Sequence, residues 1–286
     1  MKRILSYAPV LALASLATSA YGAAACPANP LLALTGRWTF NAQATPGPAN
    51  NEFAIAGQFT PSLDPPRAGI GTPAGTGWLT ITATSWINGS PTRIETDAGR
   101  YQLNSDCSGG SLIMNLSSYP MQYDFFFYNG NQSMYLVSTI NGRPAVGRAT
   151  LGASACPAGV APVNALAGPY AFKFQGIRWQ PAAFGIAGVF TASTDALFRP
   201  SFLDPRGRLD IRATSNLGFG GSVTRLEGDV GSYSILPDCS GGTLVMNLSS
   251  QPMQYDFWFY ASFNGGDVIS TSGVQSYTPA YGSFNR

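Results

Sequence analysis

The chain has 286 residues, enough for two domains of ordinary size, and its 45% hydrophobic content excludes a disordered protein. Lysine and arginine total 16 against 14 acidic residues, without a basic run, so the sequence carries no electrostatic footprint for nucleic acid. Histidine is absent, which excludes a Ser-His-Asp triad and the commonest zinc ligand. We therefore expect no nucleic-acid partner, no metal site and, because no phosphate-binding glycine motif occurs, no cofactor.

The first 25 residues are predicted to be an export signal. Lys2 and Arg3 precede an apolar segment, 4–16, and small residues follow it up to Ala25. The apolar segment is too short to span a bilayer permanently, and no later stretch of about 18 apolar residues occurs. We predict a secreted or periplasmic protein with no transmembrane helix in the mature chain, and an association with an outer surface stays open.

The segment after the signal is predicted to form about eight strands. Residues 77–87 alternate Leu79, Ile81 and Ala83 with threonines, which is the period of a strand with one buried face. A hairpin is expected around Asp97-Ala98-Gly99, between strands at 93–96 and 99–103. The remaining strands are expected at 36–41, 53–60, 111–118, 122–128, 133–140 and 145–150.

One stretch of this segment occurs twice in the chain. Ser108–Tyr128 and Ser240–Tyr260 differ at only four of 21 positions, and the match extends upstream without a gap at an offset of 132. Each copy is predicted to be a β-hairpin whose second strand carries large side chains on both faces. We expect both faces to be covered or to line a cavity, as in a barrel wall.

This internal repeat predicts the architecture of the whole protein. We predict an all-β protein of two tandem antiparallel barrels, each of about eight strands and lipocalin-like. One continuous larger barrel is the alternative. The predicted divisions are 1–25 for the signal, 26–152 for the first barrel and 153–286 for the second, whose last strand is expected within 273–286.

The four cysteines fall two in each repeat, Cys26 and Cys107 in the first and Cys156 and Cys239 in the second. Exported proteins meet an oxidising compartment, so disulfides are expected. The duplication favours one bridge inside each repeat, from the start of a barrel to its middle, with a Cys107–Cys239 bridge as the alternative. Because Cys26-Pro27-Ala28 recurs in mid-chain at 156–158, lipid attachment at Cys26 is disfavoured.

The pattern Gly-x-Tyr-x-(Leu/Ile)-x-x-Asp-Cys-Ser-Gly-Gly occurs at 99–110 and again at 231–242. It resembles a set of exported bacterial repeat proteins of unassigned function, in which a Gly-x-Tyr…Asp-Cys-(Ser/Thr)-Gly signature lies late in the repeated unit. The resemblance implies a calycin-type or allene-oxide-cyclase-like antiparallel barrel and an exported location. It covers both repeats and implies no functional residue.

Two pairs of carboxylates are the first candidates for chemistry. Glu95 and Asp97 lie two residues apart, as do Glu227 and Asp229, so strand alternation is expected to place each pair on one face. Two carboxylates across a cleft can hydrolyse glycosides, but neighbours on one strand rarely lie across a cleft. A turn role for Asp97 is the simpler interpretation.

Asp124 and Asp256 each lie among aromatic residues, and a buried carboxylate must be paired or have a raised pKa. We expect Arg93 and Arg225 to pair with them and to fix strand register. The alternative is a ligand contact in a barrel mouth, although the bulk of the neighbouring side chains favours filled interiors. The candidate ligand-binding residues are Arg93, Asn115, Gln122, Asp124, Tyr128, Arg225, Asn247, Gln254, Asp256, Trp258 and Tyr260.

These features favour an exported, non-catalytic protein that binds a small apolar or glycan-like ligand or acts as a surface interaction module. A cofactor-free hydrolase or isomerase that uses carboxylates is the alternative. It requires Asp or Glu side chains from different strands to converge in an open cleft. Whether either barrel interior is open, and which residues line it, discriminates between the two hypotheses.

Overall fold

The computed structural model describes residues 26–44, 53–64, 75–87, 90–116, 120–140, 145–177, 183–194, 206–216, 223–248, 251–271 and 281–286. The predicted export signal lies outside this part. Most of the described chain is β-strand, with two short 3-10 helices, η1 (Pro30–Ala33) and η2 (Pro162–Leu166). Among the described residues no helix has the length and apolar character needed to cross a membrane.

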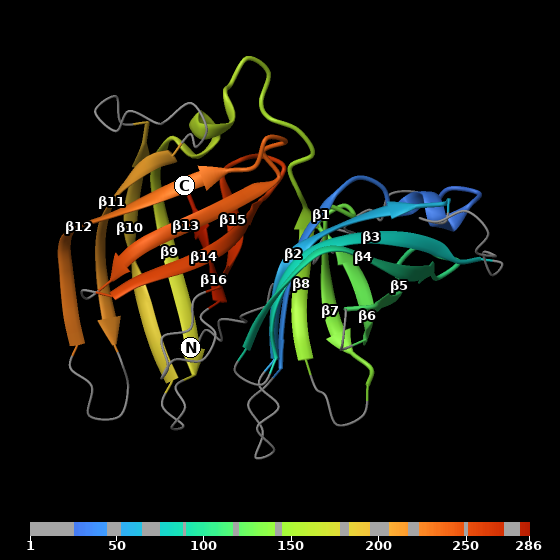
Figure 1. Cartoon of the computed structure of the whole chain (residues 1–286). Helices are drawn as coiled ribbons and strands as arrows, with labels where there is room; N and C mark the ends of the chain where they lie inside the picture. Colours follow the sequence, from blue (N-terminus) through green and yellow to red (C-terminus); the bar gives the residue numbers. More distant parts are fainter. Residues whose placement is uncertain are drawn as a thin grey trace, which may run out of the picture.

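The strands form two closed antiparallel barrels of eight strands each (Figure 1), which confirms the predicted architecture over one continuous larger barrel. The first barrel consists of β1 (Trp38–Ala44), β2 (Phe53–Ser62), β3 (Gly77–Ile87), β4 (Ser90–Leu103), β5 (Gly109–Met114), β6 (Met121–Tyr128), β7 (Ser133–Ser138) and β8 (Ala145–Leu151). The second consists of β9 (Gly168–Ile177), β10 (Ala183–Ser193), β11 (Arg206–Asn216), β12 (Val223–Ile235), β13 (Gly241–Leu248), β14 (Gln251–Phe259), β15 (Gly265–Ser270) and β16 (Tyr281–Asn285). Strands adjacent in sequence pair with one another, and β1 pairs with β8 and β9 with β16 to close each barrel.

Aromatic side chains fill the interiors of both barrels. In the first barrel, Trp38 and Phe59 stack with ring centroids 6.3 Å apart. In the second, Tyr170 and Phe190 stack at 5.3 Å, and the Phe284 ring contacts both. An eight-stranded barrel is narrow enough for side chains to fill it. The described interior side chains of each barrel form one continuous core, so a ligand site is better sought on the outside.

Each barrel has its own disulfide, as predicted. Cys26 is bonded to Cys107 in the first barrel and Cys156 to Cys239 in the second. Each bridge joins the segment before a barrel to the turn between its fourth and fifth strands. Such bonds form and persist in an oxidising, extracytoplasmic environment.

The residues of the repeated signature have structural roles at this turn. Asp106 Oδ1 accepts a hydrogen bond from the Ser108 backbone N–H (3.0 Å), and Tyr101 Oη donates to the Leu31 carbonyl oxygen (3.2 Å), which holds the η1 segment against the barrel. The second repeat makes the same two contacts. The two glycines that follow each cysteine lie too close to neighbouring carbonyl oxygens to allow a β-carbon. The signature therefore shapes the turn that carries each disulfide and holds the preceding segment against the barrel.

The hairpin predicted around Asp97 is wrong. β4 runs unbroken through this position, and β12 runs unbroken through the equivalent one. Gly99 lies within the strand, where a β-carbon would overlap the Ile113 carbonyl oxygen. A glycine in a strand indicates either a bend or a close backbone approach, and here the close approach explains it.

A β-bulge interrupts the strand register at both pairs of carboxylates. In the second barrel, Asp229 lies opposite the buried Ile211, whereas Glu227 lies opposite the exposed Arg212. The register of the first barrel shifts at the equivalent place, next to Asp97. The bulge adds a residue between the two carboxylates of each pair and interrupts the strand alternation. The side chains of Glu95 and Glu227 lie outside the described part of the structure, so the prediction that each pair shares one face stays untested.

Candidate functional site

The two barrels contact each other along a seam that buries a different face of each. β1 and β2 of the first barrel lie against β14 and β15 of the second (Figure 1). At its centre, Ala54, Ala56 and Trp86 of the first barrel pack with Trp258 and Ile269 of the second in a buried apolar cluster. These side chains point out of their own barrels, so the seam is a second, external core.

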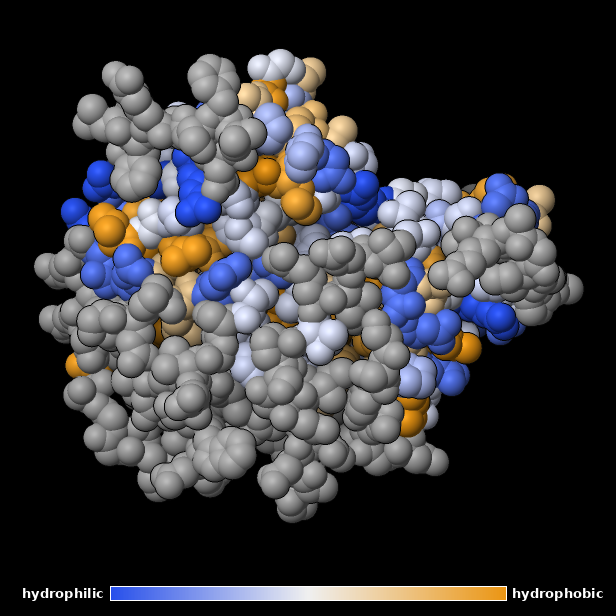
Figure 2. All heavy atoms as spheres, in the orientation of Figure 1, coloured by the Kyte–Doolittle hydropathy of each residue, from blue (hydrophilic) through white to orange (hydrophobic). Residues whose placement is uncertain are grey.

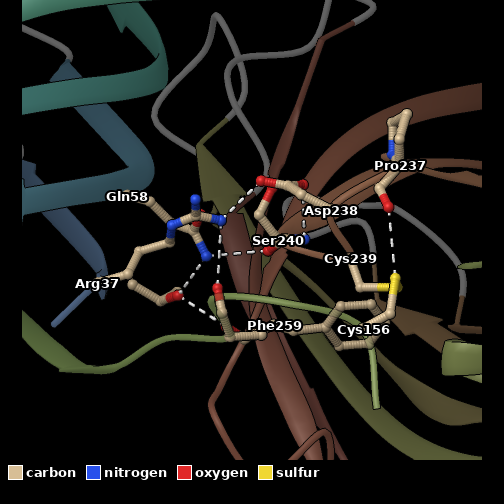
Figure 3. Close-up of polar contacts among 10 residues, drawn as sticks. Arg37, Gln58, Cys156, Pro237, Asp238, Cys239, Ser240 and Phe259 are labelled. Carbon is tan, nitrogen blue, oxygen red and sulfur yellow. Dashed lines mark hydrogen bonds and ion pairs between the residues drawn. A yellow bond between two sulfur atoms is a disulfide. The ribbon is translucent and has the colours of Figure 1, made fainter. Parts of the chain in front are cut away.

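Directional polar contacts fix the barrels in one arrangement. Gln58 Nε2 donates to the Ser240 carbonyl oxygen (2.9 Å), and Arg37 Nη1 lies 2.8 Å from Asp238 Oδ2 (Figure 3). Both contacts reach the turn that holds the second disulfide. Burial alone would raise the pKa of Asp238, but hydrogen bonds from Ser240 and Arg37 hold it below its usual value.

A fully buried carboxylate lies on the β15 side of the seam. Asp267 Oδ1 accepts hydrogen bonds from Arg148 Nη2 of the first barrel (3.0 Å) and from Tyr260 Oη (2.8 Å), while no described residue donates to Oδ2. Burial raises the pKa of Asp267, against the opposing effects of Arg148, Tyr260 and Asn41. Burial and the adjacent carboxylate also raise the pKa of Tyr260, so its phenol keeps the proton that it donates.

A groove of about 450 Å³ lies where β3 of the first barrel meets β12–β14 of the second. Thr84 Oγ1 donates to Asp256 Oδ2 across the seam (2.7 Å), and both residues line the groove. The other polar and aromatic lining residues are Thr82, Ser234, Thr243, Phe257 and Trp258. This volume lies within the range of sites for small molecules.

A smaller hollow of about 310 Å³ lies on the outside of the second barrel. It is lined by residues of β11, β12 and β13, among them Arg206, Arg208 and Asn247. Asn247 is the one candidate residue from the sequence that lines this hollow. Its walls come from the second barrel alone.

Four candidate residues of the first repeat lie on the outside of their barrel. Asn115, Gln122 and Asp124 are exposed, so the prediction that Asp124 is buried is wrong. Tyr128 is half-buried and stacks on Tyr135, with ring centroids 4.4 Å apart. No other barrel packs on β6 in the described structure, so its outer face is open to solvent, contrary to the prediction that both faces are covered.

Three candidates of the second repeat come together at the seam. Asp256 and Trp258 are buried there, and Tyr260 is half-buried beside Asp267. Gln254, two residues before Asp256, is exposed. The first barrel covers the outer face of β14 at Asp256 and Trp258, and these two residues also line the groove, so the prediction that this face is covered or lines a cavity is confirmed there.

The predicted ion pairs of Asp124 and Asp256 with arginine stay untested. Arg93 lies in β4 and Arg225 in β12, and the side chains of both arginines lie outside the described part of the structure. What the structure does show for Asp256 is the hydrogen bond from Thr84.

Sequence reasoning missed Thr84, Arg148 and Asp267. A charged or hydroxyl residue pointing out of a strand is ordinary on a barrel, so none of the three stands out. Arg148 and Asp267 are 119 residues apart, and no periodicity indicates that they meet. The one available signal is Asp267 itself, an acidic residue where the first repeat has Tyr135.

No family model matches the chain, and no curated protein matches its sequence significantly. Two crystal structures resemble it over most of its length. One is a protein of unknown function from the DUF3598 family of Nostoc punctiforme, 12% identical, with 90% of this chain and 97% of that chain covered and a TM-score of 0.25. The other is kievitone hydratase from Nectria haematococca, 8% identical, with 93% of each chain covered and a TM-score of 0.21. TM-scores this low place no constraint on what the protein does.

Proposed function

We propose that the protein is an exported, non-catalytic binding protein that takes a small glycan-like ligand in the groove at the seam. The composition of the groove carries this proposal. Hydroxyl groups of Thr82, Ser234 and Thr243, the Asp256 carboxylate and the Trp258 indole line the same space. Sugars present hydroxyl groups at their ring edges and C–H groups on their ring faces, so they match a pocket that combines a few polar groups with an apolar wall.

Asp256 is the group that would orient such a ligand. Thr84 Oγ1 donates to one of its carboxylate oxygens, which fixes the side chain at the groove. An ionised carboxylate only accepts hydrogen bonds, so it selects ligands that donate them, such as neutral sugars, over anions. The described interiors of both barrels are filled, which supports a site between the barrels.

Export of the protein is supported by two independent features. The two disulfides are typical of proteins outside the reducing cytoplasm. The basic residues Lys2 and Arg3, followed by a short apolar segment, are typical of an export signal.

Thr82→Val tests the groove, because Thr82 is exposed on its wall and valine keeps the shape while removing the hydroxyl. The probes are maltose, cellobiose and N,N′-diacetylchitobiose, measured by saturation-transfer NMR and calorimetry on the full chain. We expect at least one of them to bind, and the loss of one hydrogen bond to weaken that binding roughly fivefold. Thr191→Val, an exposed threonine on β10, is the matched control and should bind as the wild type does.

Two results would overturn this proposal. One is the absence of binding for all three disaccharides. The other is binding of equal strength in the wild type and Thr82→Val. If the apolar dye anilinonaphthalene sulfonate binds and the sugars do not, the ligand is apolar and the glycan assignment is wrong.

A further inference from the structure

Each of the two faces that meet at the seam has a counterpart on the other barrel, because the barrels are copies of one another. In the first barrel Ala56 pairs with Thr84, and in the second Ala187 pairs with Thr214. The registers on either side of these pairs match as well, since Gly57 pairs with Ala83 and Gly188 with Ala213. The β9–β11 face of the second barrel is therefore the counterpart of the β1–β3 face that the seam buries.

The other side of the seam has a counterpart too. Asp256 pairs with Ile269 and Trp258 with Asp267 in the second barrel, as Asp124 pairs with Val137 and Phe126 with Tyr135 in the first. The β6–β7 face of the first barrel is therefore the counterpart of the buried β14–β15 face. Each molecule uses one copy of each face and leaves the other copy free of the seam.

The free β6–β7 face is apolar and exposed. Phe126, Tyr135 and Val137 are 53%, 56% and 44% exposed, and Val146 on β8, which pairs with Val137, is 52% exposed. On the side of the molecule that Figure 2 shows, hydrophobic residues form small groups among polar ones, as is usual for folded proteins. The four exposed apolar side chains of this face lie together on three neighbouring strands, and such patches indicate an interaction site.

The free β9–β11 face is lined by small and charged residues. Val189 is 48% exposed, whereas its counterpart at the seam, Gln58, is 5% exposed. Ala171 and Ala187 lie beside Val189 and are exposed as well. Lys173, Asp210 and Arg212 also lie exposed on this face, and Asp210 forms an ion pair with Arg208.

We propose that the β9–β11 face of one molecule binds the β6–β7 face of a second copy, in the arrangement that the seam has within each molecule. This inference concerns a different surface from the groove and does not depend on the proposed sugar site. The two faces differ from each other, so the contact is head-to-tail and extends into open chains unless its geometry closes a ring. Figure 1 shows β5 and β6 at one end of the molecule and β11 and β12 at the other, as such a chain requires.

Charge supports this pairing. At the seam, Thr84 donates to Asp256, and the counterparts of these two residues are Thr214 and the exposed Asp124. Thr82 lines the groove next to Asp256, and the counterpart of Thr82 is Arg212. A contact between copies therefore keeps a hydrogen bond from threonine to aspartate, here from Thr214 to Asp124. It also places the Arg212 guanidinium near the carboxylate of Asp124.

The contact between copies is expected to be weaker than the seam. Thr39 donates to the Phe259 carbonyl oxygen at the seam and Gln58 to that of Ser240, but the counterparts of these donors are Ala171 and Val189. The face between copies keeps its apolar contacts and loses these two hydrogen bonds. We therefore expect reversible, concentration-dependent association.

Sedimentation velocity of the full chain over a wide concentration range tests the proposal. The wild type should form a series of species that grows with concentration. Phe126→Arg blocks the β6–β7 face and Val189→Arg blocks the β9–β11 face, so each variant alone should stay monomeric. An equimolar mixture of the two retains one intact face of each kind and should form dimers and nothing larger. Dimers in this mixture, with none in either variant alone, distinguish a head-to-tail contact from a symmetric one.

Matched variants keep the outcome interpretable if an arginine disturbs folding. Val230→Arg, at an exposed valine on β12 outside both faces, should associate as the wild type does. Asp124→Arg should weaken association about tenfold, and the double variant Asp124→Arg/Arg212→Asp should regain it. A wild type that is monomeric at all concentrations overturns the proposal. An equimolar mixture of Phe126→Arg and Val189→Arg that forms no dimers also overturns it. The same holds if Val189→Arg alone still forms dimers.

Discussion

At the residue scale, the seam depends on how the buried carboxylate of Asp267 is compensated. Its side chain is 1% exposed, and its partner Arg148 reaches it from the other barrel with 42% of its own side chain exposed. Removing one partner of a buried ion pair leaves the other charge without compensation, which usually costs more than the pair contributes. The two partners should therefore respond differently to substitution.

We predict that Arg148→Met lowers the free energy of unfolding by about 3 kcal/mol at neutral pH. Asp267→Asn should cost less, because the half-exposed arginine can turn to solvent, and the double variant should recover most of the loss. Urea unfolding followed by tryptophan fluorescence measures all three. A double variant as unstable as Arg148→Met would contradict this explanation.

The same pair predicts a pH dependence. Burial raises the pKa of Asp267, and in Arg148→Met no guanidinium opposes that rise. The folded variant then holds a proton on Asp267 more tightly than the unfolded chain does, so its stability falls as pH rises through the raised pKa and recovers as pH is lowered. The difference in the free energy of unfolding between the wild type and Arg148→Met should therefore shrink at acid pH. A difference that is the same at about pH 4 and about pH 7 would contradict this explanation.

Tyr233 offers a second test at the residue scale. Its hydroxyl donates to the Val163 carbonyl oxygen (2.9 Å), and burial raises the pKa of Tyr233 to about 12. Because the folded state holds this proton more tightly, the contribution of Tyr233 is complete below the unfolded pKa of about 10 and is lost as pH rises to about 12. Tyr233→Phe should cost about 1 kcal/mol near neutral pH, and this deficit should shrink above pH 10. Chemical unfolding of both proteins across this range measures the deficit.

At the element scale, the turn that holds each disulfide depends on two glycines. A β-carbon on Gly241 would overlap the Phe257 carbonyl oxygen, whereas one on Gly185 in β10 would meet nothing within 4 Å. We predict that Gly241→Ala costs about 2 kcal/mol or more, because strand β13 must move away from β14. Gly185→Ala, the control in the same barrel, should change stability by less than about 0.5 kcal/mol. Thermal and urea unfolding of the two variants distinguish a structural signature from a neutral one.

Sequence reasoning recovers most elements because the strands alternate clearly and the repeat confirms them. It fails at Asp97, where Asp-Ala-Gly resembles a turn but a bulged strand forms instead. The sequence does not distinguish the two cases, because a glycine that allows close backbone approach within a strand is the same residue as a glycine in a turn.

The candidate site could be predicted only in part. Asp256 and Trp258 are brought to the seam, but their copies Asp124 and Phe126 are exposed on the first barrel. Nearly identical segments thus lie in different surroundings, and local sequence carries no information about which face a neighbouring barrel covers. The partners that decide the difference lie on strands far away in the chain.

At the scale of the whole molecule, the two repeated barrels dock asymmetrically, because each contributes a different face to the seam. One barrel contributes its β1–β3 face to the seam and the other its β14–β15 face, so the second barrel is buried where the first is open. The groove for the proposed ligand and the two free faces both follow from this asymmetry. Two separate barrels joined only by a linker would have no such groove, and both copies of each face would be free.

Hydroxyl-radical footprinting of the dilute full chain, read by mass spectrometry, tests this asymmetry most directly. Phe126 and Trp258 occupy equivalent positions and are 53% and 5% exposed. The seam predicts that Phe126 is oxidised readily while Trp258 is protected, even though an indole is the more reactive ring. Oxidation of Trp258 as fast as that of Phe126 would show that the barrels do not dock in solution, and would contradict the seam and every inference that depends on it.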